Sequence, residues 1–213
     1  YSQIELRVIA HLSGDSALKD AFNKNEDIHV LTAAKIFHVS PADVTRDMRA
    51  KAKTLNFGIL YGMGPRRLAE ETDTSISEAQ MFIEKYFSQF PAISLWIKQA
   101  KQAVYESGYT ETMFGRRRLV PEALSQRSNL KAQGDRIAVN TPIQGTAADI
   151  MKMALLACAE FLDAHPGNGD MLLQVHDEVL FEVPQERLLV MAAEIRNRME
   201  RVVSLSVPLE IIL

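Results

Sequence analysis

Four residues, spaced four apart on one predicted helix, constrain this chain more than any other feature of its sequence. Arg49, Lys53, Phe57 and Tyr61 fall on one slowly drifting stripe, because an α-helix has about 3.6 residues per turn. The two cations repel each other by roughly a few tenths of a kcal/mol, and Gly58 costs about 1 kcal/mol more. Each residue alone also fits a solvated face or a core. Together they suit a helix that meets an anion at one end and a flat ring at the other, and a nucleoside triphosphate has both.

The composition is that of a globular chain. Of the 213 residues, 47% are hydrophobic and 24% are charged, and no apolar run approaches the roughly 20 residues that cross a bilayer. The chain opens on Tyr1, without a signal peptide, so we expect a piece of a longer cytoplasmic protein with no membrane partner. The single cysteine, Cys158, lies in an apolar helical pattern, which indicates a buried, reduced thiol.

The charge of the chain does not decide whether it binds nucleic acid. A net charge of -3 counts mildly against such a partner, but binding needs only a local basic surface. Three basic clusters are candidates, and each alone is also typical of a solvated face. They are residues 46–53, Arg66–Arg67 and Arg116–Arg118.

Capping and turn residues divide the chain into helices and two hairpins. Ser2 and Glu5 fit a capping box at the start of the first helix, and Pro142 is expected to bend or break a long one. The predicted helices begin at Ser2, after Asp27 (to Phe37), after Ser40-Pro41, after Thr45 (to Gly62), at Ser75 or Ser77 (to Gly108, interrupted at Pro91), at Ser128 (to Ala164) and at Pro184 (to Val203). The predicted strands form a small hairpin at 109–115, a second hairpin from 171–175 and 179–183, and a last strand at 207–213.

Acidic residues lie at the tip of the predicted second hairpin, in the run His176-Asp177-Glu178. Neighbouring side chains of a strand point to opposite faces, so Asp177 and Glu178 cannot both face one metal unless the turn rotates them. Turn chemistry alone explains an Asp-Glu pair. The flanking apolar strands instead favour a carboxylate held rigidly at a sheet surface, where a hard cation such as Mg²⁺ binds oxygen ligands.

A polar stripe follows the long predicted helix, where Arg136, Asn140 and Gln144 stand at i, i+4 and i+8. Such a stripe is usually the wet face of a helix. Long hydrogen-bonding side chains in a row also suit the backbone and minor groove of a duplex, whose acceptors are similarly placed in all base pairs.

These motifs together resemble those of the bacterial DNA polymerase I family, family A, over essentially the whole chain. The stripe from Arg49 to Tyr61 matches the family's fingers-helix motif, which runs Arg, three residues, Lys, then Phe or Tyr, and ends in Tyr-Gly. The run 174–178 is similar to the second catalytic palm motif, and Tyr1–Arg7 is similar to the first. Residues 135–149 resemble the segment that binds template and primer.

The resemblance implies an α+β fold, in which a mostly helical fingers subdomain joins a palm subdomain built on an antiparallel sheet. It places the truncated start of the palm at residues 1–13 and the fingers at 14–130. The rest of the palm, with the template-primer-binding helix and the catalytic hairpin, would be residues 131–213.

The resemblance also implies a role for each site residue. Asp177 would bind catalytic metal together with the backbone carbonyl of Tyr1, while Glu5 would contact Tyr61 and help to exclude a ribose 2′-OH. A Phe at position 57 goes with rejection of dideoxynucleotides in the family. The implied catalytic residues are Asp177, Lys53 and Glu178; the nucleotide-binding residues are Arg49, Lys53, Phe57, Tyr61, Glu5, Gln3 and His29; and the DNA-binding residues are Arg136, Asn140, Gln144 and His176.

The implied activity is template-directed DNA synthesis in replication or repair, in which two Mg²⁺ ions assist the attack of a primer 3′-OH on a deoxynucleoside triphosphate. The partners would be primer-template DNA and that nucleotide, and we expect a monomer. In the family an Asp precedes the position of Tyr1, so we expect the chain as given, which also lacks a thumb, to be inactive by itself. Two other classes remain open. They are a DNA-binding module or fragment without catalysis, and a helical protein with no nucleic-acid role.

Overall fold

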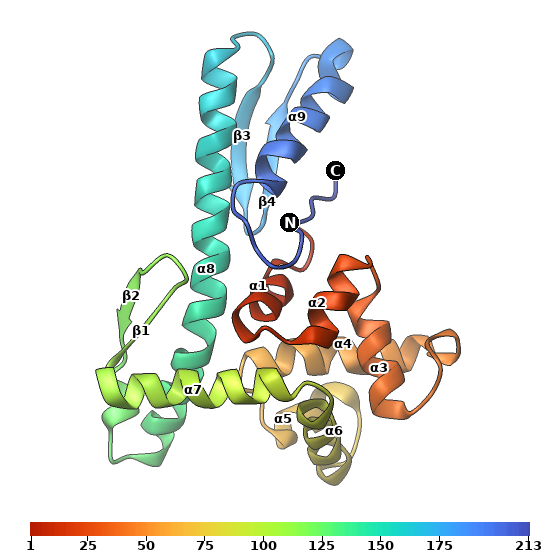
Figure 1. Cartoon of the computed structure of the whole chain (residues 1–213), viewed down its shortest axis with the longest axis vertical. Coiled ribbons are helices and arrows are strands. Elements are labelled where there is room, and N and C mark those ends of the chain that lie inside the picture. Colours follow the sequence, from red (N-terminus) through yellow and green to blue (C-terminus); the bar gives the residue numbers. More distant parts are fainter.

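One helix, α8 (Ser128–Ala164), runs along the long axis of the molecule and connects its two parts (Figure 1). The computed structural model describes all residues from Tyr1 to Leu213. A helical body surrounds the first half of α8, while a hairpin and a single helix accompany its second half. The α+β prediction is confirmed, since helices dominate and both sheets are small and antiparallel.

Most of the predicted elements are present with nearly the predicted bounds. The other helices are α1 (Ile4–Ser13), α2 (Ser16–Asn23), α3 (Ile28–Phe37), α4 (Arg46–Leu60), α5 (Pro65–Thr72), α6 (Ile76–Gln89), α7 (Pro91–Ser107) and α9 (Leu188–Glu200), with 3₁₀ turns η1 (Pro41–Asp43), η2 (Pro121–Leu124) and η3 (Gln185–Arg187). The strands are β1 (Tyr109–Glu111) with β2 (Arg117–Leu119), and β3 (Asp170–Val175) with β4 (Glu178–Glu182).

Side-chain caps fix where the helices around the cavity begin. The carboxylate of Asp27 accepts hydrogen bonds from the first backbone N–H groups of α3, and the Thr45 hydroxyl accepts one at the start of α4. Ser75 and Glu78 form a capping box on α6. Helix α7 begins at Pro91 and ends at Gly108, whose positive φ of 77° suits a glycine.

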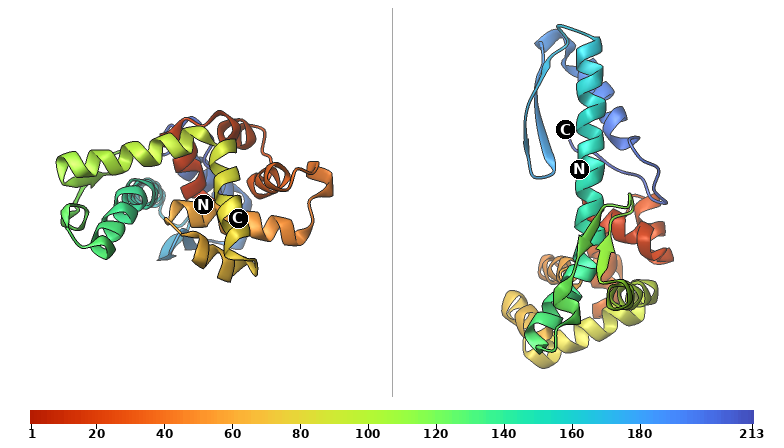
Figure 2. Two further views of the ribbon diagram at one scale, coloured as in Figure 1. Left: turned by 90° about the horizontal axis from the view of Figure 1, so that it is seen from below. Right: turned by 90° about the vertical axis from the view of Figure 1, so that its left-hand side faces the viewer.

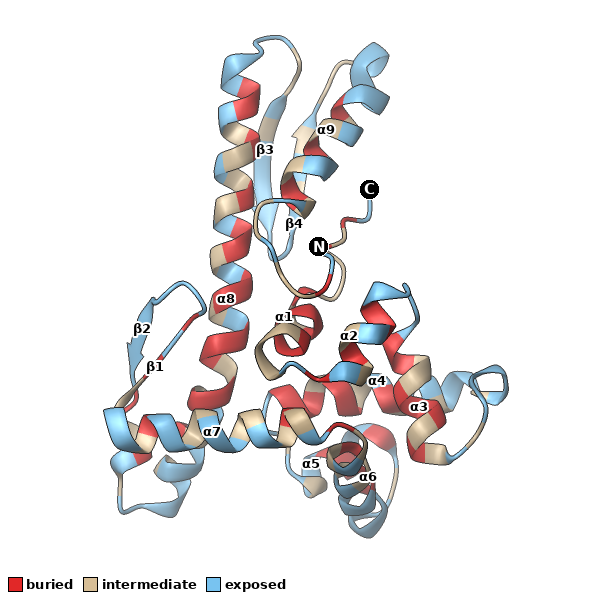
Figure 3. Ribbon diagram, viewed as in Figure 1, coloured by how far each residue is buried: buried red, intermediate tan, exposed pale blue.

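The larger hydrophobic core, here called the first core, fills the helical body. It has 26 buried residues, contributed by α1 to α6, the beginning of α7, the first half of α8 and the C-terminal segment. Figure 3 shows the buried face of α8 turned toward these helices. Residues of α8 such as Ile143 and Ile150 therefore pack against α1 to α7, so the first core spans both of the predicted subdomains.

The second core is smaller and surrounds the far half of α8. Its 9 buried residues come chiefly from α8 and α9, and half-buried residues of the β3–β4 hairpin pack against them. In the right-hand view of Figure 2, the hairpin and α9 lie on two different sides of α8. This core includes Cys158, which is free and buried as the sequence predicted.

The predicted capping box at the start of α1 is wrong. The helix begins at Ile4, and its N-cap Gln3 adopts a left-handed conformation with φ 52° and makes no side-chain cap. The Glu5 carboxylate accepts a hydrogen bond from another helix instead.

Of the bend or break predicted at Pro142, the break does not occur, because α8 continues through this residue. A proline inside a helix leaves the carbonyl of the residue four positions earlier without its N–H donor. Here the Thr110 hydroxyl of β1 donates to that carbonyl, on Ala138, at 3.4 Å. A contact with a distant strand therefore replaces the missing bond.

The predicted last strand, 207–213, does not form. The segment lies against α1 without joining a ladder: the N–H of Ser2 donates to the carbonyl of Glu210 at 2.8 Å. The buried guanidinium of Arg7 donates to the carbonyl of Pro208 at 2.7 Å and pairs with the Glu210 carboxylate. Two shorter corrections concern the helix after Ser40, which is only the 3₁₀ turn η1, and the helix after Pro184, which begins as η3.

Candidate functional site

The main cavity lies where α4, α1, α8 and the tip of the β3–β4 hairpin meet. Its volume is about 590 Å³. Most residues that the sequence singled out line it: Tyr1, Gln3, Glu5, His29, Arg49, Lys53, Phe57, Tyr61, Gln144, His176 and Asp177. Residues that are far apart in the sequence therefore meet at one place, and three predicted residues, Glu178, Arg136 and Asn140, do not line it.

The stripe on α4 lines one wall of this cavity. Arg49 and Lys53 are exposed, Phe57 is half-buried and Tyr61 is 37% exposed. The opposite face of α4, which includes Leu55, is buried in the first core. The helix is thus anchored by its apolar face and presents two cations and two rings to the cavity.

Arg49 is held by a carboxylate from α3. Its Nε and Nη2 atoms both lie 2.8 Å from Oδ2 of Asp27. The other oxygen of Asp27 accepts the backbone N–H groups of His29, at 2.8 Å, and Val30, at 3.1 Å. Burial opposes the charge on Asp27, but the hydrogen bonds from Arg49 and from the two backbone N–H groups lower its pKa. Asp27 is therefore an ionised cap.

His29 is buried beside Phe57, with ring centroids 5.9 Å apart. Its Nδ1 lies 3.0 Å from the side-chain amide nitrogen of Asn56, which is completely buried on α4. The amide oxygen of Asn56 lies 3.1 Å from the hydroxyl of Thr32. Burial lowers the pKa of His29 to about 4, and the nearby Arg49 acts in the same direction. The imidazole at the cavity wall is consequently neutral near pH 7.

Tyr61 and Glu5 connect α4 to α1 across the cavity. The Tyr61 hydroxyl donates to Oε2 of Glu5 at 2.6 Å, which is the contact that the family resemblance implied. Burial, together with this hydrogen bond, raises the pKa of Tyr61 to about 12. Tyr61 is therefore a neutral donor at ordinary pH, and Glu5 is an acceptor already in use.

The tip of the β3–β4 hairpin lies opposite α4 and is fixed by the start of the chain. The backbone nitrogen of Tyr1 donates to the backbone carbonyl of Asp177 at 2.9 Å, and the Tyr1 hydroxyl donates to the carbonyl of Met199 at 2.7 Å. Asp177 is in the turn, while Glu178 is the first residue of β4.

The donor set for a metal is small. Asp177 and Glu5 are the acidic residues that line the cavity, and Glu5 is engaged by Tyr61. No group of three or more His, Cys, Asp or Glu residues is arranged to bind an ion. The carboxylate of Asp177 fits a Mg²⁺ ion that takes one or two carboxylates and completes its shell with substrate phosphates and water. It does not by itself fit a pair of ions.

The stripe on α8 that was predicted to contact DNA is divided between two places. Gln144 lines the main cavity, whereas Arg136 lines a separate cavity of about 300 Å³ beside Gly62. Asn140 is half-buried, and its amide oxygen has no hydrogen-bond partner. A side chain at position 62 would approach the Arg136 side chain to 2.9 Å, and φ there is +67°, so Gly62 fits closely under Arg136.

Six cavity residues were not among the predicted site residues, and Asn56 behind the wall was missed as well. The six are Ile4, Ala147, Ala148, Met151, Lys152 and Gln174. Lys152 could have been found, because it stands eight residues after Gln144 on the same helix and extends the polar stripe. Asn56 gave no signal, since its importance depends on His29, which lies on another helix.

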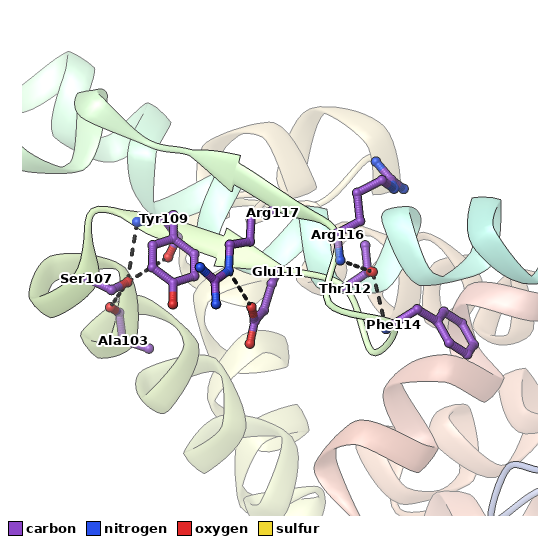
Figure 4. A network of polar contacts seen from close by, with 8 residues as sticks. All are labelled: Ala103, Ser107, Tyr109, Glu111, Thr112, Phe114, Arg116 and Arg117. Carbon is purple, nitrogen blue, oxygen red and sulfur yellow. Dashed lines mark hydrogen bonds and ion pairs between the residues drawn. The ribbon is translucent and has the colours of Figure 1, made fainter.

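The third basic cluster, Arg116–Arg118, binds groups of α8 and of the β1–β2 hairpin (Figure 4). Arg116 Nε donates to the Asp149 carboxylate at 2.8 Å, and Arg117 Nε donates to Glu111 at 3.2 Å, as the dashed line in Figure 4 marks. These partners neutralise two of the three charges, so the main role of the cluster is to hold neighbouring elements together.

None of the helices in the structure combines the length and the hydropathy that crossing a membrane would require.

Comparison with known proteins agrees with this arrangement. The family model for DNA polymerase family A matches residues 1–213. The chain is 47% identical over 211 residues to the thermostable DNA polymerase I of Thermus filiformis and 43% identical over 211 residues to the DNA polymerase I of Geobacillus stearothermophilus, in each case over 99% of this chain. These alignments take in 25% and 24% of the relatives, so the chain spans about a quarter of their length.

A solved structure has the same fold. It is the POL domain of Pol1 from M. smegmatis in complex with DNA primer-template and dNTP, with a TM-score of 0.94 and 38% sequence identity. The match covers 99% of this chain and 37% of that one. The chain therefore belongs to DNA polymerase family A.

Proposed function

We propose that this chain forms the nucleotide-adding site of a template-directed DNA polymerase, in which a primer 3′-OH attacks the α-phosphate of a deoxynucleoside triphosphate. One observation carries the proposal: a single cavity joins two cations and a ring of α4, Arg49, Lys53 and Phe57, to the free carboxylate of Asp177. The names of the relatives, and the primer-template and dNTP bound to the similar structure, support it. The division into palm start (1–13), fingers (14–130) and palm (131–213) is part of the same proposal.

The α4 wall would bind the nucleotide. Arg49 and Lys53 supply positive charge for the phosphates, and Phe57 offers a flat face for the base and sugar. Tyr61, held by Glu5, would occupy the space beside the templating base. Charged groups that are fixed before substrate arrives stabilise developing charge without reorganising, and this accounts for much of the catalytic effect in phosphoryl transfer.

Neutral His29 and Gln3 complete the nucleotide side of the cavity. His29 would donate a hydrogen bond from the side of its ring that is turned away from Asn56, because Nδ1 accepts from that amide in the present geometry. Gln3, left-handed at the start of α1, lines the cavity next to Glu5. Both supply polar contacts without adding charge.

The palm side would hold primer, template and metal. Gln144 and His176 line the cavity and would contact the primer end, while Arg136 and Asn140 would follow the duplex away from it. Asp177 and the backbone carbonyl of Tyr1 would hold divalent metal, with Glu178 close to it in sequence. Two Mg²⁺ ions would supply activation of the 3′-OH and stabilisation of the leaving oxygens, and holding the second would require the Asp that the family has before the position of Tyr1.

Primer extension by the full-length protein tests the proposal. Asp177→Asn keeps the shape of the turn and removes the charge, and it should reduce extension by at least about 10³-fold, because a catalytic ion contributes several kcal/mol. Asp170→Asn, at the other end of the same hairpin, is the matched control and should extend primers normally. Primer-template binding should survive both changes.

The chief alternative is a DNA-binding module without catalysis. Gel-shift binding by the full-length protein, combined with no extension at any Mg²⁺ concentration, would favour it and contradict the proposal. Failure to bind primer-template even at low salt, where phosphate contacts are strongest, would favour a helical protein with no nucleic-acid role.

A further inference from the structure

The start of α3 and the middle of α4 are joined by one carboxylate. Asp27 uses Oδ1 to accept two backbone N–H groups of α3 and Oδ2 to accept the Nε–H of Arg49, and Nη2 of Arg49 lies 2.8 Å from the same Oδ2 in an ion pair. The two helices pack closely side by side. A carboxylate held by three hydrogen bonds and an ion pair cannot rotate without losing several of these contacts at once, and Asp27 is therefore a rigid partner for Arg49, which lines the cavity.

This contact determines which part of Arg49 faces the cavity. A guanidinium has five N–H donors in a planar fork. The Nε–H donates to Asp27 and Nη2 lies 2.8 Å from the same oxygen, which leaves both N–H groups of Nη1 available to a ligand. Arg49 is 44% exposed, so without Asp27 its four side-chain torsions would be free to place the fork elsewhere.

We propose that Asp27 is a positioning residue, which holds the Arg49 guanidinium in the orientation that receives the phosphates of the incoming nucleotide. The inference rests on the proposed function, since it assumes that Arg49 binds those phosphates. Asp27 acts through Arg49 and need not touch the nucleotide. Its contribution is to restrict Arg49 before the nucleotide arrives, so that less side-chain freedom is lost on binding.

The charges near Arg49 suggest a second role for Asp27, with the opposite effect on nucleotide binding. Lys53 and Arg49 give the cavity wall two positive charges, and Asp27 cancels part of the field that attracts the triphosphate. If Asp27 acted only through its negative charge, it would weaken nucleotide binding, and removing that charge would lower the KM for the nucleotide. The two roles predict opposite changes in KM, which makes them separable by experiment.

Asp27→Asn isolates the contact to Arg49. Asparagine is as good an N-cap as aspartate, so its amide oxygen can keep the start of α3 in place. The amide lacks the charge that pairs with Arg49, and its NH₂ group would face the guanidinium unfavourably. Asp15→Asn is a matched control, because Asp15 caps α2 through the N–H of Leu18 and pairs with no arginine.

The experiment measures single-nucleotide incorporation by the full-length protein and its Asp27→Asn, Arg49→Ala, double and Asp15→Asn variants. Asp27→Asn should raise KM for the nucleotide about three- to tenfold, the effect expected from freeing one rotamer-rich side chain. The value of kcat and the affinity for primer-template should stay within about twofold. In the Arg49→Ala background the same substitution should have no further effect, because the residue through which it acts is gone.

Several results would overturn the inference. An unchanged KM would mean that Arg49 needs no positioning, and a lowered KM would make Asp27 a competitor of the triphosphate. An effect that persists in the Arg49→Ala background would assign Asp27 to the helix cap alone. If Arg49→Ala itself leaves KM unchanged, the proposed role of Arg49 fails and the inference fails with it, whereas an effect of Arg49→Ala without one of Asp27→Asn removes only the inference.

Discussion

Mild acidification should destabilise this protein through His29. The ring is 3% exposed, and burial lowers its pKa to about 4 from the ordinary 6.5, with Arg49 and Lys53 adding to the effect and Asp27 opposing it. A lowered folded-state pKa means that the stabilising contribution is complete above pH 6.5 and is lost as the pH falls toward 4. Each pH unit in that window changes the free energy of unfolding by at most about 1.36 kcal/mol. At about pH 5 the loss is about 2 kcal/mol, or about 1 kcal/mol if water partly screens the ring.

The assay compares denaturant unfolding near pH 7.5 and near pH 5 for the wild-type protein and for His29→Gln, which cannot titrate. The variant should lose about 1 to 2 kcal/mol less than the wild type over this interval. His38→Asn is the control, because His38 ends the same helix in a left-handed conformation that asparagine tolerates. An NMR titration of the imidazole should give a midpoint near 4. Equal pH dependence in wild type and His29→Gln, or a midpoint near 6.5, would refute the claim that His29 is held neutral.

Three further predictions concern the site and the packing of α8. Lys53→Ala should lower kcat/KM for nucleotide by about a hundredfold, in line with the loss of one electrostatic contact to a transition state, and should leave duplex binding unchanged; weaker duplex affinity with unchanged kcat/KM would place Lys53 on the DNA side. Phe57→Tyr should raise dideoxynucleotide incorporation relative to deoxynucleotide by orders of magnitude in a chain-termination assay, and equal ratios would remove Phe57 from the sugar contact. Gly134→Ala should lower the free energy of unfolding by about 1 to 2 kcal/mol, although alanine has the better helix propensity. The reason is that the new Cβ would clash with the backbone nitrogen of Ala123 in η2. Unchanged stability in denaturant unfolding would show that η2 moves aside freely.

The features that the sequence predicted well depend on neighbours in the chain. The caps at Asp27, Thr45 and Ser75 formed because a cap needs only residues two or three positions away. The stripe on α4 faces one cavity for the same reason, since helical spacing alone sets which side chains share a face. Local geometry was therefore enough to predict both the helix α4 and the side chains with which it lines the cavity.

The features that the sequence did not predict depend on distant residues. Helix α8 continues through Pro142 because a hydroxyl from β1 replaces the lost donor. The capping box of α1 does not form, because Glu5 accepts from Tyr61, a contact that the family resemblance implied but local capping rules did not. The segment near Glu210 is bound by Arg7 instead of pairing as a strand. In each case the local sequence predicts one structure, but a hydrogen bond to a residue distant in the sequence stabilises another.

The continuity of α8 restricts how the length of this protein can change. Ile150 belongs to the first core and the next residue, Met151, to the second, with no loop between them. Inserting one residue at this junction would rotate everything beyond it by about 100°, turning Cys158 away from α9 and the tip of the hairpin away from α4. An insertion of seven residues would restore the angle to within about 20° but would separate Asp177 from Lys53 by roughly two further turns. The number of residues in α8 therefore has to stay the same for α4 and the tip of the hairpin to line one cavity.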